Sequence, residues 1–317
     1  MNGRTHQTDE KMTNRTGIFI NKMAALAAAA AVALSIQSCC KTFHTDEDSS
    51  ISVALDFADE SDAEGTTIGD TKLWIFDDGG SLVEDYEYSS AAEFALQRYH
   101  LAAGHYLLVT AANLRDPFTW TEPTRATDME SLMFGLKTPA SSPAHAFYGV
   151  AEVTVEKDKS KIVKSEIRRV LSELTIQMTG APAGSTLKAT LYANAVGVYP
   201  AIKGEDGTYG LPTKEDNRSI ELPEGRESGG SIVTPVMRLM PTISGSISTI
   251  IYLTMTLANG EVLKGTIMAP PMDPSGKYIL MIEYLSMSPT MIVNPYKINQ
   301  WTEGWVVNGE ILNPDEY

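Results

Sequence analysis

Alternating apolar and polar residues mark the first strand of the chain. In "ISVALDF", residues 51–57, Ile51, Val53, Leu55 and Phe57 are the apolar members of the alternation. Successive side chains of a strand point to opposite faces, so this spacing predicts a strand with one buried face.

Other strand patterns follow before residue 156. "KLWIFDDGGSLVEDYEY" predicts a hairpin, because Asp78, Gly79 and Gly80 can adopt the positive backbone angles of a tight turn. "AGHYLLVTAAN", residues 103–113, is almost continuously apolar, which predicts a central strand covered on both faces. "AFYGVAEVTV", residues 146–155, alternates again.

One segment has a helical pattern instead. Thr127 and Glu130 have the spacing of a capping box ahead of an apolar run, so we expect a helix of two or three turns near 128–136. The rest of the stretch 115–145 holds four prolines and predicts a long excursion between strands.

A charged segment separates this set of strands from a second one. Apolar alternation lapses in "EKDKSKIVKSEIRR", residues 156–169, so we place a domain boundary within it. "LSELTIQM" and "STLKATLYAN" then alternate, and residues 203–230 form a polar excursion. "IIYLTMTLANGEVLKGTIM" predicts a hairpin with Asn259 and Gly260 as a two-residue turn, and "KYILMIEYL" and "TMIVNPYKINQW" close the set.

Together these patterns predict the fold class. Each half offers about six or seven short strands separated by turn signals, without alternating helices. We therefore expect an all-β protein of two tandem antiparallel β-sandwich domains, at 51–160 and 166–317.

The residues before the first strand predict an export signal. Arg15 and Lys22 precede an apolar run of fourteen residues, 23–36. About twenty are needed to cross a bilayer, so the run is expected to be a cleaved signal segment and not an anchor. A signal that begins at Met12 has a more usual length than one that begins at Met1.

The two cysteines of the chain lie side by side at the end of this signal. "IQSC", residues 36–39, resembles the bacterial lipoprotein box, whose cysteine becomes the lipid-modified first residue. We therefore expect residues 1–38 to be a lipoprotein signal peptide, Cys39 to carry the lipid, and 39–50 to be a tether. The alternative is a plain signal followed by two incidental thiols. Adjacent cysteines rarely bridge each other, so no disulfide is expected.

Charge narrows the choice of partners. Residues 1–38 hold four of the 25 basic and two of the 40 acidic residues, so the remainder carries a net formal charge of −17. Such a chain repels nucleic acid and anionic lipid. We expect no nucleic-acid partner.

The chain offers no recognisable catalytic constellation. His100, His105 and His145 do not have the spacing of a zinc site or of a histidine-dependent nucleophile. A glycine-rich phosphate loop, a GxSxG elbow and an HExxH pattern are all missing from the sequence. We expect no enzyme, no catalytic residue, no cofactor and no metal, and we regard a small-molecule ligand as disfavoured.

Two loops permit more than one interpretation. "DFADESDAEG" imitates half of a calcium loop, but Thr71 occupies the position of the required acidic ligand, so we expect a solvated turn. "PFTWTEP" places Phe118 and Trp120 in a proline-bounded loop. They form either a sugar-stacking platform or a clasp packed onto the domain, and the clasp is favoured.

Several of these segments, taken in order, resemble one protein family. "KLWIFDDGGSLV", "LAAGHYLLVTAANL", "AFYGVAEVTV", "RRVLSELTIQM" and "KINQW", together with the lipoprotein box, are similar to the FimB-type fimbrial anchor lipoproteins, the minor fimbrial subunits of Bacteroidales. The resemblance extends from Cys39 to about Trp301. It implies two transthyretin-like sandwiches, attachment to the outer membrane through the lipid at the base of a surface-exposed fimbrium, and a role in anchoring the fimbria and limiting its length.

The resemblance also implies fimbrial subunits as partners, bound through backbone pairing at a sheet edge. The candidate partner-binding strand is at the C-terminus and comprises Trp305, Val306, Val307, Ile311 and Leu312, around a turn at Asn308 and Gly309. This tail either is donated to the partner or completes the second sandwich. Two other functions remain open: a glycan-binding lipoprotein of a polysaccharide uptake system, and a structural lipoprotein that binds another surface protein.

Overall fold

The structure is a computed structural model of the chain and describes residues 49–123, 129–214, 218–284, 290–293 and 305–308. Strands dominate these ranges. The helices within them are short: α2 (Glu60–Ala63), α3 (Ala91–Ala95) and the 3-10 helix η1 (Met129–Ser131). No helix in the described ranges has the length and apolar character needed to cross a membrane. The predicted all-β class is confirmed.

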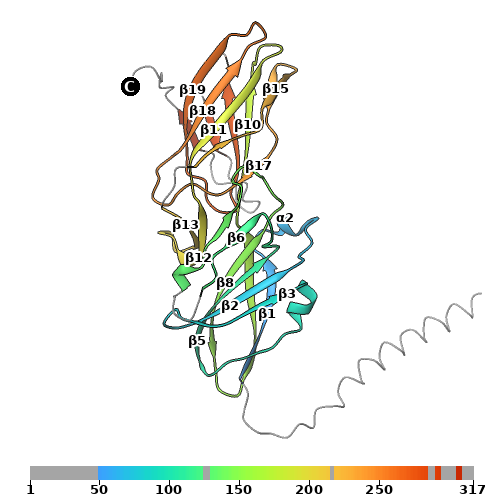
Figure 1. Cartoon of the computed structure of the whole chain (residues 1–317), viewed down its shortest axis with the longest axis vertical. Helices are drawn as coiled ribbons and strands as arrows, with labels where there is room; N and C mark the ends of the chain where they lie inside the picture. Colours follow the sequence, from blue (N-terminus) through green and yellow to red (C-terminus); the bar gives the residue numbers. More distant parts are fainter. Residues whose placement is uncertain (1–48, 124–128, 215–217, 285–289, 294–304, 309–317) are drawn as a thin grey trace, which may run out of the picture. The chain divides into compact units, whose positions relative to one another are not determined.

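The first sandwich is built from one seven-stranded sheet with the order β3-β2-β5-β8-β9-β1-β4 (Figure 1). Its strands are β1 (Ser50–Phe57), β2 (Thr71–Asp77), β3 (Leu82–Tyr88), β4 (Tyr99–His100), β5 (Gly104–Ala112), β8 (Phe147–Val155) and β9 (Ser160–Arg169). Only three residue pairs join β8 to β9. The sheet therefore divides there into two layers, β3-β2-β5-β8 and β9-β1-β4.

A hydrophobic core lies between these two layers. Ile51 and Val53 of β1 pack in one cluster with Leu73 of β2, Leu108 of β5 and Val153 of β8. The outward members of β1, among them Ala54 and Asp56, are exposed. The alternation seen in "ISVALDF" therefore predicted the buried face of this strand correctly.

A four-stranded sheet covers the other face of β2, β5 and β8. Its order is β13-β12-β7-β6, and its strands are β6 (Phe118–Trp120), β7 (Phe134–Leu136), β12 (Gly197–Lys203) and β13 (Tyr209–Pro212). Trp74 and Val109 pack against Phe134 and Val198 in this second cluster. With both faces covered, β5 is buried from Leu107 to its end, as its continuous apolar run predicted.

The second sandwich is built from a nine-stranded sheet. Its strands are β10 (Ser172–Thr179), β11 (Thr186–Asn194), β14 (Arg218–Glu221), β15 (Gly225–Ser228), β16 (Ser231–Val233), β17 (Met237–Leu239), β18 (Thr249–Thr256), β19 (Val262–Ala269) and β20 (Lys277–Glu283). One layer is centred on β11, β18 and β19, and the other on β10 with β16, β17 and β20. Ile176 and Leu280 of one layer share a buried cluster with Leu191 and Ile251 of the other.

The two sandwiches share one topology. In the first, β1 pairs in parallel with β9, and β2, β5 and β8 form an antiparallel layer. In the second, β10 pairs in parallel with β20, and β11, β18 and β19 form the antiparallel layer. The first and the last strand of each sandwich thus pair with each other in parallel. β20 is therefore the last strand of the second sandwich.

The prediction of a helix near 128–136 is wrong. Within that range the structure has the single turn η1 and then strand β7, while Thr127 lies outside the described residues. β7 pairs with β6 and with β12, and it buries Phe134 and Leu136 in the core. Pairing on both edges and burial of the apolar side chains outweigh the local helical pattern.

The segment expected to link the two domains is a strand. β9 occupies Ser160–Arg169 and pairs with β1 along its length, so the first sandwich extends to Arg169. Buried Val163 and Ile167 alternate with exposed Lys164 and Glu166. The charges therefore point to solvent and are compatible with a strand. Whether residues 51–160 and 166–317 fold independently stays a prediction.

Both predicted hairpins form, and the turn of the second one is longer than expected. β18 and β19 are joined through a loop in which Gly260 N donates to Leu257 O and Leu257 N donates to Glu261 O. Asp77, Gly80 and Ser81 make the equivalent bonds between β2 and β3. Both are three-residue loops with a glycine at positive φ, +79° at Gly80 and +86° at Gly260, not a two-residue turn.

Candidate functional site

Two strands of the second sandwich have a free edge on the same side. Among the described residues β19 pairs only with β18, and β20 pairs only with β10. A strand with an unpaired edge carries a row of free backbone N–H and C=O groups, which can accept a further strand. β19 pairs with β18 over eight consecutive residues without a bulge, so its edge is regular.

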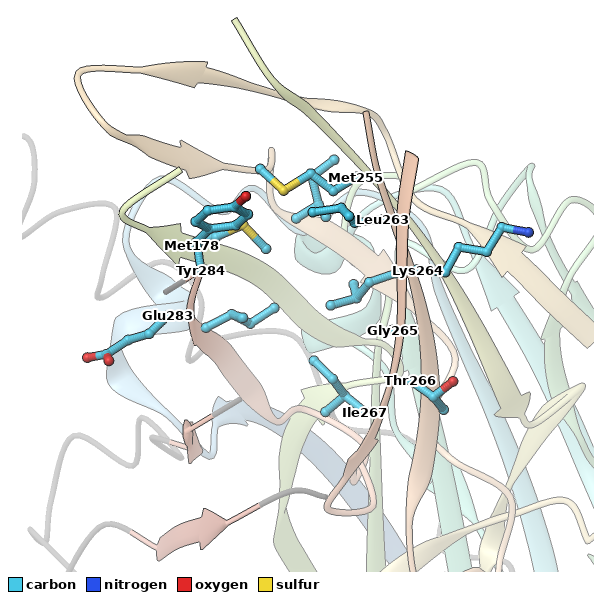
Figure 2. Close-up of a pocket in the computed structure, with 12 residues that line it drawn as sticks. Met178, Met255, Leu263, Lys264, Gly265, Thr266, Ile267, Glu283 and Tyr284 are labelled. Carbon is cyan, nitrogen blue, oxygen red and sulfur yellow. The ribbon is translucent and has the colours of Figure 1, made fainter. Parts of the chain in front are cut away.

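A narrow apolar cleft lies between these two edges (Figure 2). Met178, Leu263, Ile267 and Tyr284 are among the side chains that line it, whereas Lys264 and Glu283 point away from it. Its volume is about 30 Å³, roughly the volume of one water molecule in the liquid. The cleft can take a small side chain of an added strand but not a drug-sized ligand, which needs about 300 Å³ or more.

The corresponding place in the first sandwich is partly closed. There the equivalent strands β8 and β9 pair at Phe147, Tyr148 and Gly149. No pairing between β19 and β20 occurs in the described part of the chain. In the second sandwich, by contrast, the edges of β19 and β20 have no hydrogen-bonded partner among the described residues and lie on either side of an apolar cleft, although β21 (Thr290–Val293) contacts β20.

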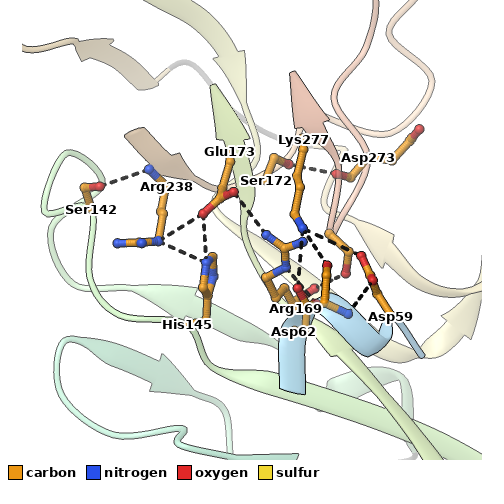
Figure 3. Close-up of polar contacts among 12 residues, drawn as sticks. Asp59, Asp62, Ser142, His145, Arg169, Ser172, Glu173, Arg238, Asp273 and Lys277 are labelled. Atoms are coloured by element: carbon orange, nitrogen blue, oxygen red, sulfur yellow. Dashed lines mark hydrogen bonds and ion pairs between the residues drawn. The ribbon is translucent and has the colours of Figure 1, made fainter. Parts of the chain in front are cut away.

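A cluster of ion pairs lies at the junction of β9 and β10 (Figure 3). The Arg169 side chain is only 3% exposed; its Nε donates to Asp62 Oδ2 at 2.9 Å, and its Nη1 lies 3.2 Å from Glu173 Oε2. Lys277 of β20 lies 3.6 Å from Asp62 and 3.7 Å from Asp59. These contacts attach α2, the element directly after β1, to the junction and to the last strand of the second sandwich.

Glu173 connects the cluster to a second basic group. Its Oε1 lies 2.9 Å from His145 Nε2 and 3.2 Å from Arg238 Nε. The hydrogen bond with His145 and the charges of the neighbouring basic groups outweigh burial and lower the pKa of Glu173 to about 2. The carboxylate is thus held ionised.

This pKa predicts an acid-sensitive contribution to stability. The pKa is depressed on folding, so the contribution is complete above pH 4.5 and is lost as the pH falls towards 2. In urea unfolding, the difference in free energy between the wild type and Glu173→Gln should be largest at pH 7, up to about 3 kcal/mol, and should shrink below pH 4.5. Glu156→Gln, at an exposed pair with Lys159, is the control with a small difference at every pH. A difference for Glu173→Gln that does not change with pH would contradict the assignment.

The sequence did not predict this cluster. The segment "DFADESDAEG" was expected to be a solvated turn, but it forms α2, and the side chain of Asp62 is only 8% exposed. His145 looked isolated, because its partners Glu173 and Arg238 are distant in the sequence. Periodic patterns report local structure and contain no signal for such pairs. No group of three or more histidine, cysteine or acidic residues among the described residues is placed to hold a metal.

The expected site residues lie mostly near the ends of the chain. Cys39, Ile311 and Leu312 are outside the described residues. Trp305, Val306 and Val307 belong to β22 (Trp305–Asn308), which pairs antiparallel with β21 (Thr290–Val293) in a separate two-stranded sheet.

The described tryptophan side chains do not form a common platform. Trp74 is 2% exposed and belongs to the core of the first sandwich. Trp120 is half-buried, with Lys72 Nζ 4.4 Å from the centre of its ring, and neighbouring Phe118 is buried. The loop "PFTWTEP" therefore packs as the favoured clasp.

The sequence matches a known protein family over most of its length. Residues 42–306 match the model of the family described as fimbrillin-A associated anchor proteins Mfa1 and Mfa2. The chain belongs to this family. The expected resemblance to fimbrial anchor proteins is confirmed at the level of the family.

One solved structure has a similar fold. The fimbrial anchor protein Mfa2 from Porphyromonas gingivalis is 12% identical, with a TM-score of 0.50, and the match covers 82% of this chain and all of that one. A crystal structure titled as a putative adhesin from Bacteroides thetaiotaomicron is also 12% identical, with a TM-score of 0.49 and coverage of 77% and 94%. No curated protein matches the sequence.

Proposed function

We propose that this protein is an outer-membrane lipoprotein that anchors a fimbria to the cell surface and limits its length. The lipid on Cys39 would hold the chain in the membrane, and the second sandwich with the tail beyond it would hold the neighbouring fimbrial subunit. Membership of the anchor family supports the fimbrial role. The lipoprotein box after a short apolar run supports the attachment.

The observation that carries the proposal is the pair of free edges at β19 and β20. Pairing with an added strand gives affinity through backbone hydrogen bonds, and the apolar cleft between the edges adds contacts for alternate side chains. A site of this kind suits an extended segment of a protein partner.

The first strand of the chain is expected to stay in place. β1 pairs with β9 over eight residues and with β4 at Ser50 and Ile51, and α2 behind it is attached to Arg169 and Lys277. The sequence has no lysine or arginine between Lys41 and Lys72. A protease of trypsin-like specificity therefore has no site at which it could separate β1 from β2. The resemblance to fimbrial lipoproteins implies that polymerising subunits accept a partner strand where their own first strand has been removed. An intact β1 would then end the polymer.

The tail is the proposed donor strand. β20 closes the second sandwich as β9 closes the first, so β21 follows a complete sandwich, as β10 does. This repeat supports donation of the tail, with Trp305, Val306 and Val307 in β22. The contact between β21 and β20 supports the alternative, that the tail completes the second sandwich. Ile311 and Leu312 would extend the same segment.

Deletion of residues 303–317 tests this proposal. The protein is expected to remain folded and in the membrane fraction while fimbriae are shed into the medium, measured by immunoblotting of cells and medium. Glu303→Gln, which keeps the whole tail, is the control with normal retention. Normal retention after the deletion would contradict the donor role. Normal fimbrial length and attachment after removal of the whole gene would contradict the anchor function and favour a different surface partner.

A further inference from the structure

A polar cleft lies where β8 and β9 separate in the first sandwich. It has a volume of about 280 Å³. Three strands contribute to its lining, with Tyr148 and Glu152 from β8, Lys164, Glu166 and Arg168 from β9, and Tyr209 from β13. Unlike the cleft at β19 and β20, it is lined by groups that form hydrogen bonds.

One acceptor in this cleft is fixed in place. Tyr209 Oη donates to Glu152 Oε1 at 2.6 Å, and Lys203 Nζ donates to the same oxygen at 3.0 Å. The hydrogen bond from Tyr209, followed by that from Lys203, lowers the pKa of Glu152. The carboxylate is therefore ionised, and its second oxygen accepts no hydrogen bond from the described residues.

Two further charged side chains line the cleft, and the charge of one of them, Arg168, adds to the hydrogen bonds from Thr208 in lowering the pKa of Asp206. Neither Glu166 nor Arg168 makes a side-chain hydrogen bond or an ion pair with a described residue. They are two positions apart on β9 and so project from the same face, about 7 Å apart along the strand. This spacing suits a ligand that offers a hydroxyl to the carboxylate and another to the guanidinium.

Two tyrosines form the wall of the cleft. Tyr148 is 1% exposed, and its Oη donates to Tyr209 O at 3.1 Å. The ring reaches this position because Gly210, at a φ of +105°, has no side chain: a Cβ there would lie 1.8 Å from Tyr148 Oη. A side chain at position 210 would therefore displace the Tyr148 ring from the wall of the cleft.

We propose that this cleft binds a neutral saccharide. Its lining carries two basic groups, Lys164 and Arg168, and two acidic ones, Glu152 and Glu166. Lys164 is paired with Asp56 at 3.1 Å and Glu152 with Lys203 at 3.0 Å, so the cleft has no excess of either charge that would select a charged ligand. A neutral polyol can bond to both kinds of group, because its hydroxyls both donate and accept hydrogen bonds. The volume lies just below the range of about 300–1,000 Å³ for drug-sized ligands, which fits one or two sugar rings.

A saccharide site would go against the expectation from the sequence that a small-molecule ligand is disfavoured. The proposed site does not depend on the anchoring proposal. The tryptophans take no part in it. A fimbrial anchor with such a site could also contact neutral glycans at the cell surface.

Saturation-transfer NMR on the full chain tests the proposal with maltotriose, mannotriose and cellotriose as probes. At about 10 mM a site with a Kd of about 1 mM is largely occupied. We expect transfer to the ring protons of at least one of these sugars. Arg168→Ala and Glu166→Gln should each weaken the binding at least tenfold, whereas Lys161→Ala, an exposed residue at the other end of β9, should leave it unchanged. Thermal melting checks that all the variants fold.

Three outcomes would overturn the proposal. The first is the absence of transfer to any of the three sugars. The second is transfer that survives both substitutions, which would show adventitious contact elsewhere on the surface. The third is stronger binding of trigalacturonate than of the neutral sugars, which would show that the cleft prefers an anion.

Discussion

A Cys39→Ala variant is expected to lose palmitate labelling completely and to move from the membrane fraction to the soluble fraction. The apolar run 23–36 is too short to remain as a span, and no helix in the described part of the chain could replace it. Attached acyl chains would then supply the affinity for the bilayer, at about 0.8 kcal/mol for each buried CH2 group. Fimbriae held by this protein should appear in the medium together with it.

The neighbouring thiol provides the matched control. Cys40→Ser changes the residue next to Cys39 and leaves the lipoprotein box intact, so labelling and fractionation should be those of the wild type. Palmitate labelling of Cys39→Ala would contradict the assignment of the lipidated residue. If only Cys40→Ser lost the label, Cys40 would be the modified residue.

Strands with one buried face could be predicted from the sequence because their signal is local. β1, β10 and β11 each bury alternate apolar side chains, such as Val53, Ile176 and Leu191, at the spacing that the sequence displays. β5 was recognised in the same way from its unbroken apolar run. In each case the period of two residues follows from strand geometry and needs no knowledge of the partner strands.

β9 and β7 show where local patterns mislead. β9 is long and has charged residues on its outward face, so Lys164 and Glu166 masked the alternation of the buried residues Val163 and Ile167. At β7, Phe134 and Leu136 follow a helix-start pattern, and only pairing with β6 and β12 makes the segment a strand. The deciding interactions come from residues far away in the sequence.

The repeated topology was not predictable from these patterns either. The parallel pairs β1 with β9 and β10 with β20 connect strands more than 90 residues apart in sequence. Alternation of apolar and polar residues indicates that a segment is a strand, but it does not indicate which strand pairs with it. The same limit applies to the open cleft, because the free edges of β19 and β20 exist only once every other pairing is known.

Arg169→Met is expected to destabilise the protein by about 3–5 kcal/mol, because it leaves buried acidic groups without their partner. The guanidinium contacts Asp62 and Glu173, and Asp62 is only 8% exposed. Lys277 lies 3.6 Å from Asp62 and would compensate only in part. The loss is a large fraction of the roughly 5–15 kcal/mol that stabilises a typical domain, and urea unfolding at pH 7 should show it as a lower midpoint.

Arg115→Met is the matched control for this substitution. Arg115 is 74% exposed and lies 3.8 Å from Asp70, so removal of its charge should change the stability little. Adding Asp62→Asn to Arg169→Met should restore part of the loss, because the uncompensated carboxylate is then gone. Hydrogen exchange should become faster in β1 and α2 of Arg169→Met, since α2 is attached to the junction through this ion pair. Equal losses of stability in Arg169→Met and Arg115→Met would show that the cluster does not hold β1 in place. The proposal that an intact β1 ends the polymer would then lose its structural basis.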